Sequence, residues 1–408
     1  MMNPLIVGIP AFRERAWLPR TLEHLARQDD PDFQVWVCVN QPRSYARDPA
    51  FAAIHAENTA TLAWLSAALT DWPFQLVVLD AVSENKAPDP KSAGVGWARR
   101  RIFDRVSQTY PRAICVSLDA DTEVGPAYIS QLKADFARYP NGLGLAVPYY
   151  HRLPHDRSRA RRLLRYEIYM RYYQLSLWRI GSPYAFLPLG SAMAFRAEAY
   201  RRMGGIPARK AGEDFYFLQQ LRKTGPLIRW STATVYPSAR PSDRVPFGTG
   251  PLMDQADAAL VRQRFPFYRQ ADFDLLAQTF ELFEPLYRKP LRLPIHEYVE
   301  RYWGGEKLFR RFRKNFPDGA RFTKACHEKL DGLRTLQILR FYQDRRDVLP
   351  REERELNLLL EKMGKPAVAL DFENDDLDAL NALRDLLFAY EGQAQQSFMA
   401  GWNLRWRW

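Results

Sequence analysis

The first 118 residues alternate short apolar runs with longer segments whose apolar positions recur at helical spacing. The apolar runs, rich in β-branched residues, are 5–9, 33–39, 74–79 and 113–118. The helical segments between them are 16–28, 50–70 and 92–108. Short apolar runs are typical of strands buried on both faces, and their alternation with helices is typical of crossover units. The pattern therefore predicts an α/β fold, Rossmann-like, whose mostly parallel sheet carries helices on both faces.

The alternation continues as far as Pro237 and then stops. It adds strands at 143–148 and 192–196 and helices near 126–139, 157–179 and 214–223. The next segment, SARPSDRVPFGTGP, is dense in Pro, Gly and Ser, which predicts a loop at a domain boundary. Beyond it, Leu and Phe at helical spacing predict helices at 272–287, 305–315, 327–342, 351–363 and 376–391. We therefore predict an α/β domain over 1–250 and a mainly helical C-terminal region over 251–408.

Length and composition agree with two regions that each bury a core. The chain has 408 residues, of which 47% are hydrophobic, and this length exceeds that of most single cores. Its three cysteines are widely spaced, which indicates buried thiols rather than a disulfide framework. The sequence shows neither a secretory signal pattern nor an apolar run of membrane-spanning length, so we expect a cytoplasmic protein.

The net charge of +12 lies mostly before residue 251 and gathers in the helix predicted at 157–179. Seven arginines there are opposed only by Asp156 and Glu167. The arginines are Arg157, Arg159, Arg161, Arg162, Arg165, Arg171 and Arg179. Such a patch can bind phosphate-rich substrates, an anionic membrane or nucleic acid, and it can equally be a solvated helix face.

Aromatic residues alternate with these arginines, and the chain ends in Trp402–Trp408, where Trp and Arg also alternate. Arginine on one side of a helix with aromatic residues on the other favours peripheral association with the inner face of a membrane. The alternative is that the aromatic residues pack between the two regions of the protein.

Polar residues follow several predicted strands at the point where each strand ends. Pro10–Glu14 follows the first, Asn40 the second, and Asp119-Ala120-Asp121 the fourth. Two carboxylates one residue apart can point to the same side of an extended segment, and such oxygen ligands suit Mg²⁺ or Mn²⁺. A divalent ion held there can stabilise a leaving diphosphate, although many D-x-D triplets are plain surface loops.

Two further segments carry candidate chemistry. Glu213 and Asp214 precede a predicted helix, where a carboxylate can serve as a general base or can simply stabilise the helix start. Lys91 and Arg99 flank a glycine-containing helix start that allows the backbone to approach phosphate. Glycine-rich helix starts are also common without any ligand.

Taken in order, these segments resemble the family 2 glycosyltransferases of the GT-A fold. The turn Pro10–Glu14 resembles the family's P-x-x-N-E turn, and Asp119-Ala120-Asp121 matches its D-x-D motif. Three other segments match in order and spacing: Gly94–Arg100, Gly190–Arg196, and Gly204–Ile206 through Glu213-Asp214 to Leu218. The resemblance covers about residues 5 to 237.

The resemblance implies inverting transfer, in which a base deprotonates an acceptor hydroxyl that attacks the anomeric carbon of a nucleotide sugar. It implies Asp214 as the base with Glu213 beside it, and Asp121 as the main metal ligand. Asp119 would contact the ribose or the metal. The nucleotide pocket would be lined by Pro10, Phe12, Glu14, Asn40, Lys91 and Arg99, with Phe12 against the nucleobase.

The sequence departs from the family at five positions or motifs. Asn40 stands where the family carries an acidic residue, and Arg13 and Arg100 stand where it carries asparagines. No histidine follows the last strand to complete a metal shell, so Arg240 and Arg244 are alternative groups to neutralise a diphosphate. The Q-x-x-R-W motif of processive synthases is missing, which favours the addition of single sugars.

We therefore expect an inverting, metal-dependent glycosyltransferase with a nucleotide-sugar donor and a saccharide or lipid-linked acceptor, as in bacterial surface-polysaccharide or lipopolysaccharide assembly. An anionic membrane surface is a further expected partner, and nucleic acid is not expected. One alternative is a nucleotidyltransferase, although that class shows a glycine-rich loop after the first strand and Pro10–Glu14 contains no glycine. Another is a non-catalytic module that binds membrane or nucleic acid through the basic helix.

Overall fold

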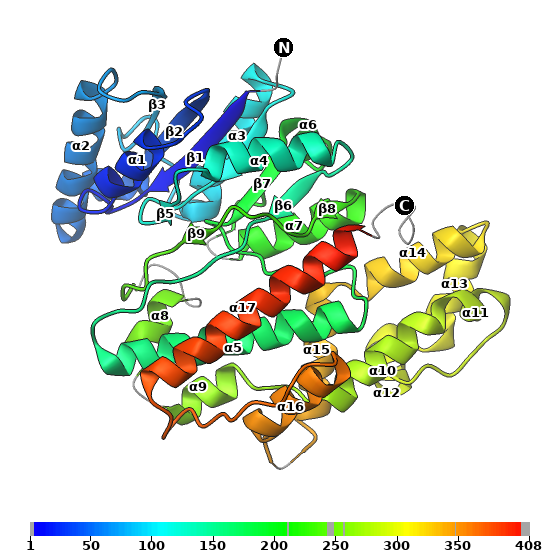
Figure 1. Cartoon of the computed structure of the whole chain (residues 1–408). Helices are drawn as coiled ribbons and strands as arrows, with labels where there is room; N and C mark the ends of the chain where they lie inside the picture. Colours follow the sequence, from blue (N-terminus) through cyan, green and yellow to red (C-terminus); the bar gives the residue numbers. More distant parts are fainter. Residues whose placement is uncertain (1–3, 210–211, 243–248, 256–257, 347, 401–408) are drawn as a thin grey trace. The chain divides into compact units, whose positions relative to one another are not determined.

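The structure, a computed structural model, describes residues 4–209, 212–242, 249–255, 258–346 and 348–400. The chain forms two compact units, each made of two segments (Figure 1). Unit 1 comprises Met1–Pro154 and Pro188–Met253, and unit 2 comprises His155–Leu187 and Asp254–Trp408. The second unit begins close to the predicted border at residue 250. It also includes His155–Leu187, which the prediction had placed in the α/β domain.

Unit 1 is built on a seven-stranded sheet in the order β3-β2-β1-β4-β7-β6-β8. Its strands are β1 (Leu5–Ala11), β2 (Phe33–Asn40), β3 (Gln75–Ala81), β4 (Ile114–Ser117), β6 (Gly144–Ala146), β7 (Met193–Arg196) and β8 (Leu227–Ile228). Neighbouring strands are parallel except at β7, which is antiparallel to both β4 and β6. The prediction of a mostly parallel sheet is confirmed. All residues of β1 and β4 are buried, as their continuous apolar runs require.

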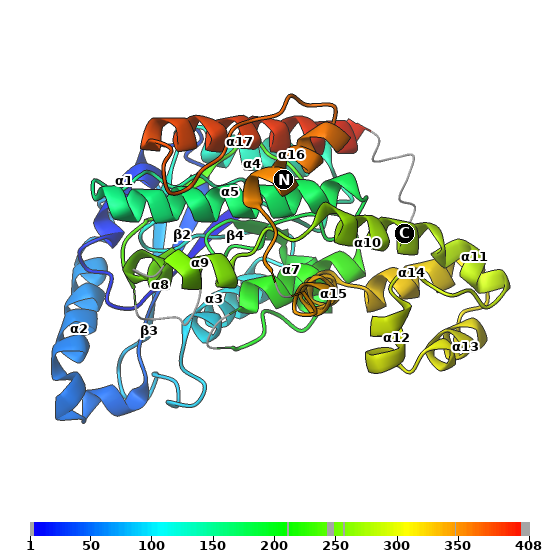
Figure 2. The same ribbon diagram turned by 90° about the horizontal axis from the view of Figure 1, so that it is seen from below.

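Helices cover both faces of this sheet (Figures 1 and 2). They are α1 (Leu18–Ala26), α2 (Ala52–Ala67), α3 (Val95–Thr109), α4 (Tyr128–Arg138), α6 (Ala197–Arg202) and α7 (Glu213–Thr224), with α8 (Thr249–Asp254) at the end of the unit. The packing of α3 on β1 is close, because a Cβ atom added at Gly8 would lie 2.7 Å from the Phe103 ring. Glycine at this position lets the helix lie directly on the strand.

A second, two-stranded sheet forms beside the main one from β5 (Glu123–Val124) and β9 (Val235–Tyr236). Hydrophobic periodicity cannot reveal strands of two residues. β5 directly follows the Asp119–Asp121 triplet, and β9 lies four residues before Arg240. Their antiparallel pairing therefore brings the segment around residue 240 next to the triplet.

Unit 2 is helical, as predicted for the C-terminal region. Its helices are α5 (Arg157–Arg179), α9 (Ala258–Arg264), α10 (Gln270–Glu281), α11 (Phe283–Arg288), α12 (His296–Trp303), α13 (Glu306–Asn315), α14 (Gly319–Lys329), α15 (Gly332–Gln343), α16 (Glu352–Lys362) and α17 (Leu377–Ala400). The single helix expected at 327–342 is two helices, because Asp331 caps the start of α15 by accepting a hydrogen bond from the backbone of Arg334. The single helix expected at 272–287 likewise divides at Leu282.

The basic helix α5 is a core element of unit 2 and packs along α17 (Figure 1). Tyr172 is fully buried, stacks on Phe267 and donates a hydrogen bond to the carbonyl of Tyr268. The aromatic side of α5 thus packs inside the protein. Phe267, Tyr268 and α17 all follow residue 250, so the alternative of packing between the predicted regions 1–250 and 251–408 describes these aromatic residues. Tyr172 is not available as a membrane-facing side chain.

Most arginines of α5 have partners within unit 2. Ion pairs join Arg159 to Asp254, Arg165 to Glu352, Arg171 to Glu167 and Glu391, and Arg179 to Asp274. The expected basic patch is largely neutralised by carboxylates that follow much later in the sequence. Within the described residues, no helix has both the length and the apolar character needed to span a membrane. The Trp/Arg segment Trp402–Trp408 lies outside the described residues.

The three cysteines, Cys38, Cys115 and Cys326, are free and buried. Burial raises the pKa of the Cys38 thiol to about 12, although nearby Arg101 opposes this shift. The prediction of buried thiols is confirmed.

Candidate active site

The candidate site lies at the edge of the unit 1 sheet where β1, β2 and β4 end. Because β7 runs the other way, the segment before it, Gly190–Ala192, reaches the same edge. The order β3-β2-β1-β4 places successive crossovers on opposite sides of β1, so the connections diverge between β1 and β4. In open α/β sheets a ligand crevice forms at such a switch point, outside the carboxyl ends of the strands.

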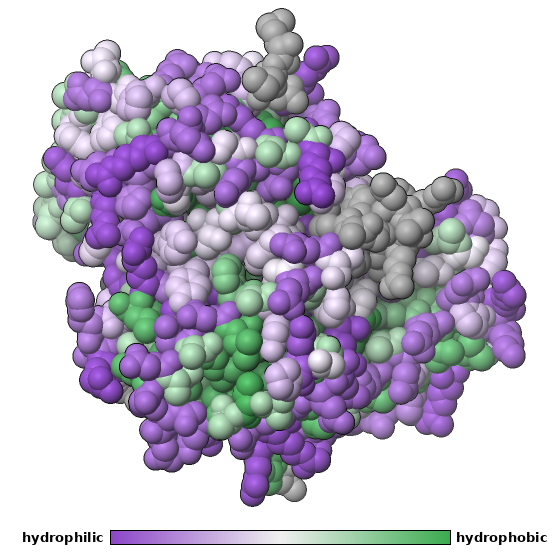
Figure 3. All heavy atoms as spheres, viewed as in Figure 1, coloured by the Kyte–Doolittle hydropathy of each residue, from purple (hydrophilic) through white to green (hydrophobic). Residues whose placement is uncertain are grey.

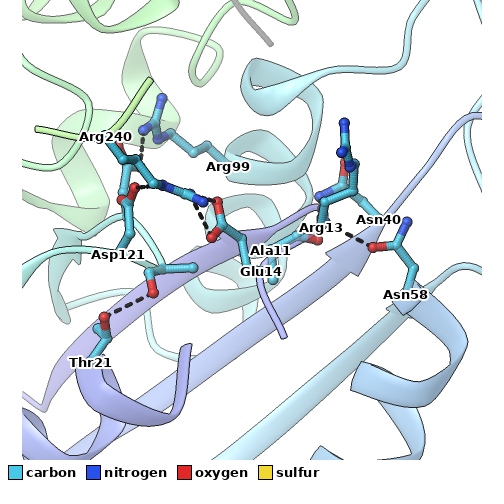
Figure 4. Close-up of polar contacts among 11 residues, drawn as sticks. Ala11, Arg13, Glu14, Thr21, Asn40, Asn58, Arg99, Asp121 and Arg240 are labelled. Carbon is cyan, nitrogen blue, oxygen red and sulfur yellow. Dashed lines mark hydrogen bonds and ion pairs between the residues drawn. The ribbon is translucent and has the colours of Figure 1, made fainter. Parts of the chain in front are cut away.

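The turn after β1 is held in an unusual conformation. Arg13 has a φ of 58°, and within the described residues it alone among residues other than glycine has a positive φ. Its backbone N–H donates to the side chain of Asn58 at 2.9 Å (Figure 4). Asn58 in turn donates to Gln41. Both amide side chains are buried. This network compensates the strain at Arg13 and fixes the direction of the residues on either side of it.

Glu14, the residue after Arg13, points to the gap between β1 and β4 and is bound there by Arg240 (Figure 4). Both Glu14 carboxylate oxygens accept from Nη2 of Arg240, at 2.5 and 2.6 Å. Nε of the same guanidinium donates to Asp121 at 2.7 Å. Burial acts to lower the pKa of Arg240, but Asp121 and Glu14 outweigh it and raise that pKa. Arg240 thus joins the end of β1 to the D-x-D triplet.

A second arginine joins the triplet to the acidic pair. Arg99, on α3, forms ion pairs with Asp119 and with Glu213 and has a side chain that is 4% exposed. Burial alone would lower the pKa of Arg99, and the surrounding carboxylates raise it. The guanidinium packs directly against Gly190, where any added Cβ would collide with it. Arg99 therefore depends on the glycine that precedes β7.

Asp214 differs from its neighbour Glu213. Glu213 is 2% exposed and paired with Arg99, whereas Asp214 is half-buried and accepts a hydrogen bond from the backbone of Phe215 at 2.7 Å. Burial and the charge of Glu213 raise the pKa of Asp214 to about 6, and Arg99 partly opposes this rise. A carboxylate with a pKa near neutrality suits proton abstraction.

The triplet fits a divalent cation by its donor chemistry. Asp119 and Asp121 supply carboxylate oxygens at one sheet edge, and the Asp119 side chain is 37% exposed. Each already faces a guanidinium, so a cation has to compete with Arg240 for Asp121. Within the described ranges, no group of three or more His, Cys, Asp or Glu residues forms a metal cage.

Aromatic rings lie beside the β1 turn on the side of β2. Phe12 contacts Tyr45, with ring centroids 6.4 Å apart, and Tyr45 stacks on Phe51 at 3.9 Å. Asn40, at the end of β2, is buried and donates to the carbonyl of Ala11 at 3.1 Å. Asn40 therefore ties β2 to β1, and the three rings offer an apolar surface of the kind that stacks on a nucleobase.

The structure links most of the site residues named from the sequence. Glu14 and Asp121 both pair with Arg240, and Asp119 and Glu213 both pair with Arg99. Pro10 is buried within β1, and Lys91 is exposed on the loop before α3. Arg244 lies outside the described residues.

Sequence reasoning missed several residues of this edge. Asn58, Gln41 and Tyr45 shape the β1 turn, and Arg240 was considered only as an alternative to a metal ligand. A buried asparagine on a helix and an arginine in a Pro/Gly-rich loop carry no local signal. Only their long-range contacts reveal them.

No family model matches the sequence, and no curated protein matches it either. Among solved structures, the chain is similar to S. aureus TarS residues 1–349 in complex with UDP-GlcNAc, with 13% identity, a TM-score of 0.39 and coverage of 98% of this chain and 92% of that one. The match to a longer TarS structure has the same identity and TM-score, covers 79% of this chain, and spans only about half (55%) of that one. A mannosyltransferase from Pyrobaculum calidifontis, in complex with GDP-Man and Mn²⁺, matches with 15% identity, a TM-score of 0.35 and coverage of 96% and 88%. These scores are too low to establish a family or an activity.

Proposed function

We propose that unit 1 is a GT-A-type catalytic domain of an inverting family 2 glycosyltransferase, which moves a sugar from a nucleotide-diphosphate donor to an acceptor hydroxyl. The observation that carries the proposal is the chain of contacts from Glu14 to Glu213 at the carboxyl edge of the sheet. It places a D-x-D triplet, two arginines and an acidic pair at the switch point of an α/β fold. The order of the sequence motifs supports the same reaction.

Asp214 is the general base in this proposal. Its pKa of about 6 leaves it mostly ionised at neutral pH, so it can accept a proton. The same raised pKa makes it a stronger base than an ordinary aspartate. The base takes the proton of the acceptor hydroxyl, whose oxygen forms the new bond to the anomeric carbon as the bond to the diphosphate breaks. Glu213 acts as a positioning residue, because Arg99 holds it.

Arg240 and the triplet serve the leaving diphosphate. A guanidinium is well suited to binding phosphate oxygens, and Arg240 is the partly exposed cation of the site, with 19% of its side chain exposed. Asp121 and Asp119 would hold a Mn²⁺ or Mg²⁺ ion, which when bound would supply further positive charge against the diphosphate. Phe12 and the rings behind it would contact the nucleobase, and Glu14, Asn40 and Lys91 would complete the pocket.

The acceptor in this proposal is a saccharide or a lipid-linked saccharide, as in bacterial surface-polysaccharide or lipopolysaccharide assembly. Its support comes from the sequence resemblance. Addition of a single sugar follows from the missing Q-x-x-R-W motif, and cytoplasmic action at the inner membrane face follows from a cytoplasmic donor.

The experiment that tests the donor site is calorimetric titration of the full chain with UDP, GDP, CDP and TDP, each with and without Mn²⁺. We expect one nucleotide to bind, more tightly with Mn²⁺. Asp121→Ala should remove the effect of the metal. Asp32→Ala is the matched control, because Asp32 is 81% exposed and lies away from this edge.

If no nucleotide binds under any condition, the donor site is wrong. If a nucleotide binds with the same affinity with and without Mn²⁺, the metal role of Asp121 is wrong while the transferase proposal stands. Incubation of the corresponding nucleotide sugar with the enzyme and detection of the released nucleoside diphosphate then tests catalysis itself.

A further inference from the structure

Unit 2 carries a concentration of positive charge that its carboxylates do not neutralise. Residues 301–329 contain nine Lys and Arg against three Asp and Glu. This segment runs from the end of α12 through α13 to the end of α14. Most arginines of α5, by contrast, are paired.

The charge forms a stripe on α13. Lys307, Arg310, Arg311 and Lys314 follow the spacing i, i+3, i+4, i+7, which places them on one helix face. All four are exposed. Within the part of the chain that the structure describes, none of them forms an ion pair or a side-chain hydrogen bond. We call these four residues the α13 stripe.

The rest of α13 explains why the stripe faces outward. Leu308 and Phe309 are buried on the other side of the helix, so the apolar face is already used for packing. The remaining charged residues of the helix, Glu306 and Arg313, pair with each other. In Figures 1 and 2, α13 lies at one edge of the helical unit, on the far side of that unit from α9.

Aromatic residues precede the stripe. Tyr302, at the end of α12, is 55% exposed, and Trp303 beside it is half-buried. Gly304 and Gly305, both with positive φ, make the turn that joins them to α13. On the face drawn in Figure 3, hydrophobic surface gathers over the helical unit while the surface over unit 1 is mostly hydrophilic.

We propose that the α13 stripe is a docking surface for an anionic lipid bilayer, with Tyr302 at the level of the headgroups. Four unpaired cations on a single face attract a negatively charged surface, and each contributes about 1 kcal/mol close to such a membrane. Exposed Tyr beside Lys and Arg is typical of the membrane–water interface. The apolar side of α13 stays in the protein, so binding is electrostatic and peripheral.

The test is sedimentation of the full chain with vesicles of 30% phosphatidylglycerol and 70% phosphatidylcholine, compared with pure phosphatidylcholine. The wild type is expected to bind only the anionic vesicles, and less as salt rises, because screening weakens the attraction. Arg310→Gln with Arg311→Gln should lower the partition coefficient about 30-fold, at about fivefold per cation.

A matched control removes the same charge elsewhere in unit 2. Arg351 and Arg354 are also exposed, but they lie among the glutamates at the start of α16. Arg351→Gln with Arg354→Gln should bind the anionic vesicles as the wild type does. Circular dichroism and thermal unfolding of both double variants establish that they are folded.

Three results would overturn the proposal. One is equal binding to both kinds of vesicle. Another is a change in binding that does not separate the two double variants. Equal loss in both would show an effect of net charge alone. No loss in either would place binding elsewhere, as in Trp402–Trp408. The third is tighter binding to a duplex oligonucleotide than to vesicles with the same dependence on the stripe, which would make it a nucleic-acid surface.

Discussion

The two units use the same ionic chemistry in different surroundings. In unit 2, Arg171 lies between Glu167 and Glu391, and the three side chains are 0 to 3% exposed. In unit 1, Arg99 is just as buried, but its partner Asp119 is 37% exposed. Arg240 and Asp121 are partly exposed as well, at 19% and 14%.

This difference in solvent exposure distinguishes ion pairs that only stabilise the fold from ion pairs that can take part in ligand binding. A sealed pair has already lost its water, so its members must stay together to avoid an uncompensated buried charge. A pair that still meets solvent can exchange its partner for a ligand of the same charge. The Arg171 cluster of unit 2 is therefore a structural set of charges, whereas Asp119, Asp121 and Arg240 of unit 1 still meet solvent.

Replacement of Asp214, the proposed base, should produce the largest change in activity. Asp214→Asn keeps the shape of the side chain and removes the proton acceptor. We expect kcat to fall by about 10²–10⁴-fold with little change in nucleotide affinity. Steady-state assays of nucleoside diphosphate release measure the first, and calorimetry measures the second. Asp89→Asn, at an exposed carboxylate, is the control, and an Asp214→Asn enzyme that turned over normally would remove the residue from the mechanism.

The sealed cluster of unit 2 should give the largest loss of stability. Arg171→Met leaves Glu167 and Glu391 buried without the cation that joins them, although Arg384 still pairs with Glu167, so we expect the free energy of unfolding to fall by about 3–5 kcal/mol. Denaturant unfolding followed by circular dichroism measures it. Arg159→Met on the same helix breaks an exposed pair with Asp254 and should cost less than about 1 kcal/mol. Equal losses in both variants would contradict the distinction between sealed and exposed pairs.

Loss of the exchangeable cation should weaken donor binding without unfolding the protein. Arg240→Gln removes a charged donor that we assign to the diphosphate, and we expect the Kd for the nucleoside diphosphate to rise by about tenfold or more in the absence of Mn²⁺. Calorimetry checks the affinity and thermal unfolding checks the fold. Arg27→Gln serves as a control because Arg27 is 71% exposed. An unchanged Kd would leave Arg240 as a brace between Glu14 and Asp121 only.

The raised pKa of Asp214 predicts a graded dependence on pH. The proposed base must be ionised, so kcat/KM should level off about one pH unit above the pKa of about 6 and should fall about tenfold per pH unit well below it. The profile of kcat/KM reports the free enzyme, which is the state described here. A profile that stays flat down to pH 4.5 would show that a group of lower pKa controls the reaction.

Local pattern was enough to predict the periodic part of unit 1 and the residues of its edge. The continuous apolar runs of β1 and β2 can only be buried strands, and the alternation with helices forces a mostly parallel sheet. Because parallel strands end at one edge, the residues after them, Glu14 and Asp119–Asp121, could be placed together before any contact was known. These inferences depend on local pattern and on the geometry of one sheet.

The partners of those residues depend on long-range packing, which local pattern does not reveal. Glu14 and Arg240 are 226 residues apart, and their contact depends on a pairing of two-residue strands that leaves no periodic trace. Helix α5 reads as a basic surface helix because its sequence shows mainly its own charges, while most of its neutralising carboxylates come from α8, α10, α16 and α17. A local sequence pattern shows whether a segment is a helix or a strand and which of its faces is polar. The free energy of burying a charge depends instead on the residue that long-range packing places beside it.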